Sequence, residues 1–127
     1  MPAPSDAPHL PRSAPIEAYG KGGFAFAEMS HRGSLLCLPD AIWAWPLTAP
    51  AEIDKRSLAR VFEAADAIDT LIIGTGIGAW LAPPALRDAL RAVRVMLDTM
   101  QTGPAITTYN IMIGERRRVA AALIAVP

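Results

Sequence analysis

The regular change between short apolar runs and helical patterns constrains this chain more than any other feature. After residue 54, one predicted helix face carries apolar residues at i, i+3, i+4 and i+7: Leu58, Val61, Phe62 and Ala65. Asp54 or Ser57 is placed to cap this helix. The apolar run 70–73 then ends at Gly74, which is typical of a strand that is covered on both faces.

The same alternation continues to the end of the chain. Pro83-Pro84 opens a second predicted helix, and Pro104 suits the first turn of a third. Residues 94–97 are predicted to form a further strand, and the apolar run 119–126 predicts a long final one. Strands that alternate with helices imply βαβ units with right-handed crossovers, and therefore a largely parallel central section.

The N-terminal half has a different pattern, in which short strands follow glycine-containing turns. We predict turns at 19–23 and 31–34, and strands at 24–29, 34–38 and 41–45. Strands joined by such short turns indicate an antiparallel hairpin or meander. The predicted class is therefore α/β, with a single three-layer-type domain, a mixed sheet, and N-terminal antiparallel strands followed by βαβαβ units.

The chain is predicted to divide into a tail and one domain. Residues 1–15 hold five of the twelve prolines and few large apolar groups, so we expect a disordered Pro-rich tail there. Residues 16–127 have the size of a single domain. Neither a secretory signal nor an apolar run of about 18 residues is present, so we expect a cytoplasmic protein without membrane insertion.

Charge and residue counts argue against several classes of function. Twelve basic and twelve acidic residues cancel, whereas nucleic-acid binders usually carry a basic excess, and Arg116-Arg117-Arg118 is interpreted as a solvated turn. The single cysteine, Cys37, allows no intrachain disulfide and lies in an apolar run. With only His9 and His31 as histidines, we predict no metal, no cofactor and no catalytic residues, and favour a non-enzymatic protein.

Two polar segments are candidates for a binding site. The Gly74-Thr75-Gly76 turn follows a buried strand, where ligands of α/β proteins usually bind, although its spacing does not match a nucleotide-binding motif. Residues 107–110 place four polar groups on consecutive helical positions. These groups either form buried hydrogen bonds to the glycine turns or line a polar pocket beside them. The candidate residues are Gly74, Thr75, Gly76, Met100, Thr102, Thr108, Tyr109, Asn110, Glu115 and Arg117.

Six motifs along the chain also carry a family resemblance. They are Tyr19-Gly20-x-Gly22-Gly23-Phe24, Trp45, Gly74-Thr75-Gly76, Met100-x-Thr102, Ala105-x-x-Thr108-Tyr109-Asn110 and Glu115-x-Arg117-x-Val119-Ala120. In this order they resemble the Mth-type domain family, from about Ile16 to the end of the chain. That family includes a mitochondrial respiratory complex I assembly factor and an adipogenesis-associated human protein. The resemblance implies an α/β fold with a mixed sheet and no established enzymatic activity.

Two functional hypotheses follow. The first is a non-enzymatic binding or assembly module that docks on an unidentified protein partner of a respiratory or translocation membrane complex, with Trp43, Trp45 and Trp80 as contact residues. The alternative is a small-molecule-binding protein or enzyme with a pocket between the Gly74-Thr75-Gly76 turn and the Thr108-Tyr109-Asn110 helix. There, Tyr109 or Glu115 would transfer protons. A homodimer is compatible with either hypothesis, because the long final strand would offer a pairing edge.

Overall fold

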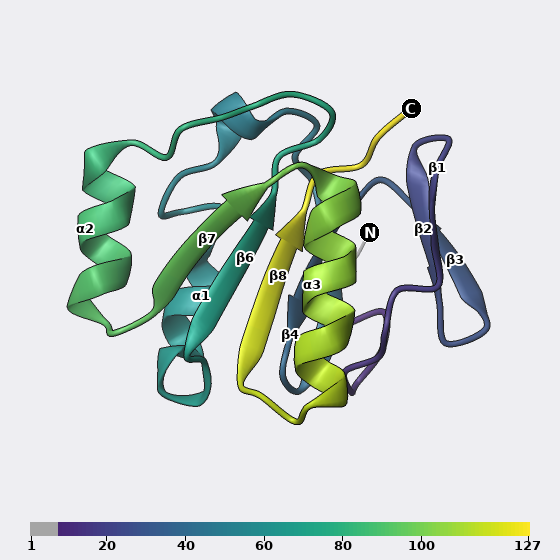
Figure 1. The fold of residues 1–127 in the computed structure, drawn as a ribbon, viewed down its shortest axis with the longest axis horizontal. Coiled ribbons are helices and arrows are strands. Elements are labelled where there is room, and N and C mark those ends of the chain that lie inside the picture. Colours follow the sequence, from purple (N-terminus) through teal and green to yellow (C-terminus); the bar gives the residue numbers. More distant parts are fainter. Residues whose placement is uncertain (1–7) are drawn as a thin grey trace, which may run out of the picture.

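A five-stranded mixed sheet organises the molecule, and a computed structural model describes residues 8–127 of it (Figure 1). The strand order is β5 (Ala41–Trp45), β4 (Ser34–Leu38), β8 (Val119–Leu123), β6 (Thr70–Gly74) and β7 (Met96–Met100). Strand β4 pairs antiparallel with β5 and β8, whereas β6 pairs parallel with β7 and β8. The α/β class with a mixed sheet is confirmed.

The helices cover the two faces of this sheet in separate layers. Helices α1 (Ala59–Glu63) and α2 (Pro84–Ala92) pack on one face, and α3 (Thr102–Gly114) packs on the other. Figure 1 shows α3 in front of β8 and α1 behind the sheet. Two short 3-10 turns, Pro50–Glu52 and Ala65–Ala67, flank α1. The three-layer arrangement expected from the sequence is therefore present.

Alternation along the central strands divides the core in two. Leu71 and Ile73 of β6 point to α1 and α2, while Ile72 between them points to α3. All three side chains are buried, because both sheet faces are covered. In β4, Leu36 and Cys37 likewise point to opposite faces.

A second, three-stranded antiparallel sheet lies beside α3. It contains β1 (Ala18–Gly20), β2 (Gly23–Phe26) and β3 (Met29–Arg32), and the buried rings of Phe24 and Phe26 join the α3 side of the core. Some predicted bounds are wrong here. The sequence predicted turns over all of 19–23 and 31–34 and one strand over 24–29, but parts of these ranges belong to β1, β2 and β3. Two-residue turns with positive φ separate the strands, and such turns match the twist of a hairpin.

The other element boundaries differ from the predictions mainly at the ends. Strands β4 and β5 have the predicted bounds, whereas β7 begins at Met96 rather than at residue 94. The reason is that Arg94 takes a left-handed conformation with φ 62°, and Val95 N–H donates to Leu90 O at 3.0 Å to close the end of α2. Strand β8 ends at Leu123 rather than Val126.

The predicted tail of residues 1–15 differs from the structure in its second half. Residues 1–7 lie outside the described residues, but the segment from His9 onward lies against the domain. His9 N–H donates to Ile42 O at 2.8 Å, and Ile42 N–H donates to Leu10 O at 2.9 Å. Ala14 and Ile16 are buried. Few apolar residues are enough here, because the edge of β5 supplies backbone partners.

The final strand does not offer the pairing edge on which the homodimer expectation was based. Strand β8 lies between β4 and β6, so both of its edges are paired. The outer strands of the sheet are instead β5 and β7. Within residues 8–127, no helix has the length and apolar character needed to cross a membrane.

Candidate functional site

The glycine turn after β6 is held by hydrogen bonds on both sides. Thr75 N–H donates to Met100 O at 2.8 Å, and the Thr75 hydroxyl donates to Gly78 O at 2.6 Å. Gly76 has φ +87°, a conformation that side chains rarely adopt. The turn is therefore a defined loop at the carboxyl end of a parallel strand, as the sequence predicted.

Thr102, the first residue of α3, joins this turn to the end of β8. Its buried hydroxyl donates to Ile124 O at 2.7 Å and accepts a bond from Gly76 N–H at 2.9 Å. A Cβ atom added at Gly74 would lie 3.0 Å from this hydroxyl oxygen and 3.0 Å from Leu123 Cδ2. The close packing against Thr102 explains the glycine at position 74, and the positive φ explains the glycine at position 76.

Asn110 and Tyr109 hold the N-terminal segment. Ile16 N–H donates to Asn110 Oδ1 at 2.9 Å, and Asn110 Nδ2 donates to Ile16 O at 2.8 Å. The Tyr109 hydroxyl donates to Ala14 O at 3.3 Å, and its side chain is buried. These contacts match the structural alternative that the sequence left open, although the partner is the N-terminal segment rather than the glycine turns.

The two groups with nucleophilic or acidic chemistry in the core are not available for reaction at neutral pH. Burial raises the pKa of the Cys37 thiol to about 12. Burial, followed by the neighbouring Cys37, raises the pKa of the Tyr109 hydroxyl well above its usual range. Both groups therefore stay protonated and act as parts of the core.

The remaining candidate residues form two pairs, Met100 with Thr108 and Glu115 with Arg117. The Thr108 hydroxyl lies 3.6 Å from the Met100 sulfur, beside the sheet. Glu115 and Arg117 are exposed after α3 and form an ion pair at 3.8 Å. The neighbouring Arg118 contacts Asp69 at 2.8 Å and lowers the pKa of that carboxyl.

An apolar groove of about 600 Å³ lies at the carboxyl end of β6 and β8. We call it the carboxyl-edge groove; its lining includes Arg32, Ser34, Leu47, Thr75, Gly76 and Ile124. The buried Ser34 hydroxyl donates to Leu47 O at 2.7 Å and fixes one wall. Of the sequence-predicted residues, only Thr75 and Gly76 line this groove, and residues 108–110 face elsewhere.

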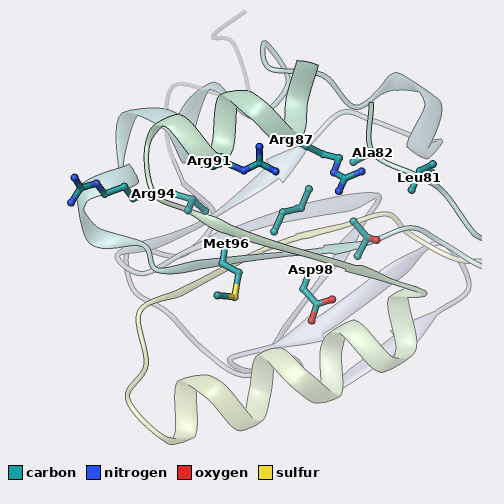
Figure 2. Close-up of a pocket in the computed structure, with 10 residues that line it drawn as sticks. Leu81, Ala82, Arg87, Arg91, Arg94, Met96 and Asp98 are labelled. Atoms are coloured by element: carbon teal, nitrogen blue, oxygen red, sulfur yellow. The ribbon is translucent and has the colours of Figure 1, made fainter. Parts of the chain in front are cut away.

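A second groove of about 560 Å³ runs between α2 and β7. We call it the arginine groove. Arg87, Arg91 and Arg94 line it from the α2 side, and Met96 and Asp98 project from the other side of β7, away from the arginines (Figure 2). The sequence analysis missed this groove. Its signal was the spacing i, i+4 of Arg87 and Arg91, which places both on one face of α2, with Arg94 following the end of the helix.

Neither groove contains the ligands of a metal site. Within residues 8–127, no group of three or more His, Cys, Asp and Glu residues could hold a metal ion. His9 and His31 do lie together, with ring centroids 4.5 Å apart.

The tryptophans predicted as contact residues are largely packed into the core. Trp45 is buried and donates from Nε1 to Ser57 O at 2.8 Å. Trp43 and Trp80 are partly buried against the core on the α1 and α2 side. The Arg60 guanidinium carbon lies 3.4 Å from the Trp43 ring centroid. The tryptophans therefore do not form one exposed apolar patch.

Sequence relatives cover nearly the whole chain. An uncharacterized protein of Rhodobacter capsulatus is 35% identical over 120 residues, which are 94% of this chain and 91% of that protein. NADH dehydrogenase [ubiquinone] 1 alpha subcomplex assembly factor 3 of Xenopus tropicalis is 30% identical over 109 residues. That match covers 86% of this chain but 60% of the assembly factor, so the chain spans less than two thirds of its length.

Solved structures of similar proteins share the fold. The Rpa2829 protein of Rhodopseudomonas palustris is 70% identical, with a TM-score of 0.84 over 100% of this chain and 94% of that one. A Bartonella henselae protein described as an outer membrane protein is 46% identical, with a TM-score of 0.90 over 94% and 100%. A Mth938-like domain of Bordetella pertussis has a TM-score of 0.78 at 24% identity, over 98% and 92%.

The family assignment follows from the extent of these matches. The similarity to assembly factor 3, together with the fold shared with a Mth938-like domain, confirms the Mth-type resemblance that the sequence motifs indicated. A family model matches residues 16–124, which include the five-stranded sheet, its helices and the arginine groove. The chain belongs to the family described as "Protein of unknown function (DUF498/DUF598)".

Proposed function

We propose that this chain is a protein-binding module that assists the assembly of a respiratory membrane complex. The similarity to assembly factor 3 of Xenopus tropicalis, at 30% identity over 86% of this chain, supports the proposal. Because the chain spans 60% of that relative, the proposal concerns the shared domain.

The observation that carries a binding role is the placement of the chemically active side chains. Cys37 and Tyr109 are buried, protonated parts of the core, and Asn110 is bonded to the Ile16 backbone. The accessible features include two open grooves, one apolar and one rich in arginine. Such surfaces suit the docking of another molecule better than the transfer of a proton or an acyl group.

Removal of the chain from its host cell tests the assembly role. Membrane complexes separated on a native gel should show less assembled NADH dehydrogenase, while a second respiratory complex serves as the internal control. Re-expression of the intact chain should restore the assembled complex. An unchanged amount of assembled NADH dehydrogenase after removal would contradict the proposal.

A second candidate function is the binding of a small apolar molecule in the carboxyl-edge groove. The observation in its favour is the position of this groove at the carboxyl ends of β6 and β8, where ligands of α/β sheets usually bind. A thermal-shift screen of metabolites should then find a compound that stabilises the chain, and a bulky Gly78→Leu substitution in the groove should abolish that shift. A screen with no stabilising compound would argue against this candidate.

A further inference from the structure

We propose that the open edge of β7 binds an extended acidic segment of a partner protein as a sixth strand of the sheet. This inference rests on the proposed protein-binding function and specifies the chemistry of the partner. Strand addition to an exposed edge is a recurring way of binding peptides, because backbone hydrogen bonds supply affinity and alternate side chains supply specificity.

The backbone of β7 has unpaired groups on its outer side. Met96 N–H donates to Asp69 O at 2.9 Å, and Thr75 N–H donates to Met100 O at 2.8 Å, so the even-numbered residues point toward β6. Since backbone groups alternate in direction along a strand, Leu97 and Thr99 point theirs outward. Within the described part of the chain, β7 pairs with β6 alone.

The charges beside this edge favour an acidic partner. Arg87, Arg91 and Arg94 are exposed and line the groove above β7 (Figure 2). Arg91 contacts the exposed Asp88 at 3.3 Å, in a pair that solvent screens strongly. The lining thus contains three positive side chains and one negative one, Asp98.

The position of Asp98 adds a requirement for the sequence of the partner. Figure 2 shows Met96 and Asp98 on the side of β7 that faces away from the arginines. An added strand also alternates its side chains between the two faces. Its acidic residues should therefore alternate with apolar or neutral ones, so that carboxylates meet the arginines and uncharged side chains lie beside Met96 and Asp98.

A second copy of this chain fits the same edge poorly. Antiparallel pairing of β7 with its own copy, about a twofold axis perpendicular to the sheet, would put both α2 helices on one face. The arginines of the two grooves would then lie close together, and like charges at an interface oppose association. The edge is therefore better suited to a partner of opposite charge.

Fluorescence anisotropy with the full chain tests the proposal. The probe is a labelled peptide of about nine residues with alternating Glu and Val. We expect saturable binding that weakens at least roughly tenfold in the variant Arg87→Glu, Arg91→Glu, Arg94→Glu. The matched control carries the same charge change at exposed arginines elsewhere, Arg12→Glu, Arg56→Glu, Arg116→Glu, and should keep the affinity of the intact chain.

Two further peptides separate strand pairing from charge alone. A peptide with Lys in place of Glu should not bind. Of two peptides N-methylated either at all Glu or at all Val residues, at least one should lose its affinity, because one of these two sets of N–H groups faces β7. Equal binding of both N-methylated peptides, or equal binding by the groove variant, would overturn the proposal. A dimer in sedimentation that the groove variant dissociates would also overturn it, in favour of a second copy.

The failure of this inference can be distinguished from the failure of the proposed function. If removal of the chain lowers the amount of assembled complex but the acidic peptide does not bind, only the inference is overturned. If the peptide binds as expected but assembly is normal without the chain, the assembly role is overturned while the binding edge stands.

Discussion

The two outer strands of the five-stranded sheet, β5 and β7, differ in what lies beside them. At β5, the N-terminal segment pairs with Ile42 through backbone bonds to His9 and Leu10. At β7, the outward backbone groups face an open groove with Arg87 on its opposite side. An exposed edge invites unwanted pairing, and proteins limit this by covering the edge or by placing charges beside it. This chain uses both means, one at each edge.

The cover over β5 is also linked to the opposite side of the fold. Asn110 and Tyr109 on α3 bond to the backbone of Ile16 and Ala14, so α3 positions the segment that closes the edge. No comparable anchor lies beside β7 in the part of the chain that the structure describes. The difference indicates that one edge belongs to the stability of the domain and the other is free for binding.

The largest expected effect comes from removing a large side chain at each edge. Ile42 is fully buried, whereas Met96 is 69% exposed. Ile42→Ala should lower the free energy of unfolding by roughly 2–5 kcal/mol, because it leaves a cavity in a closed core. Met96→Ala, the matched change at the open edge, should alter it by less than about 0.5 kcal/mol. Urea denaturation measures both, and equal losses would show that the two edges do not differ.

A smaller effect should follow from releasing the anchor of the closed edge. Asn110→Ala leaves the partly buried N–H and C=O of Ile16 without their partners, so we expect a loss of roughly 1–3 kcal/mol in the free energy of unfolding. Thr107→Ala on the exposed side of the same helix is the control, with a change under about 0.5 kcal/mol. If the two variants lose the same stability, Asn110 does not anchor the segment.

The central sheet could be predicted from the sequence because its signals are local. The bounds of β4 and β5 follow from short apolar runs that end at proline or polar residues, and Gly74 ends β6 as expected. The small sheet was harder to predict. Its β1 and β3 are short and mostly exposed, so their hydrophobic pattern is weak. Only their pairing with β2 makes them strands.

The roles of the candidate site residues could be predicted only in part, because they depend on contacts that are distant in sequence. Asn110 bonds to Ile16 across 94 positions, and Thr102 bonds to Ile124 across 22. The polar run 107–110 indicated that hydrogen bonds were needed there. It carried no information on which backbone groups supplied them, since any exposed edge or turn has unpaired groups.

Shortening the chain should make the two edges more alike in hydrogen exchange. A chain that begins at Ala14 lacks the backbone partner of the Ile42 amide, whose N–H donates to Leu10 O at 2.9 Å. We expect its exchange to become about fivefold faster, the effect of losing roughly 1 kcal/mol of local protection. The Leu97 amide at the open edge should exchange at the same rate in both chains. An unchanged Ile42 rate would show that the segment does not protect β5.

The smallest expected effect is a loss of stability in acid, which arises where the N-terminal segment that covers β5 contacts His31. The His31 ring contacts the His9 ring, and its Nε2 atom lies 3.1 Å from Ser34 O. Burial, followed by the charge of His9, lowers the pKa of His31 below its usual value of about 6.5.

The sign of the pH dependence follows from this shift. Below about pH 6.5 the unfolded chain binds the proton more readily than the folded one, so stability should fall as the pH falls. Because His31 is only partly buried, we expect a decrease of about 2 °C in Tm between pH 7 and pH 5 that His31→Gln removes. His9→Gln should remove a part of it, because the contribution of burial at His31 would remain. A His31→Gln variant with the full acid decrease would assign the effect to carboxylates such as Asp69, whose pKa is lowered by Arg118 at the far end of the sheet.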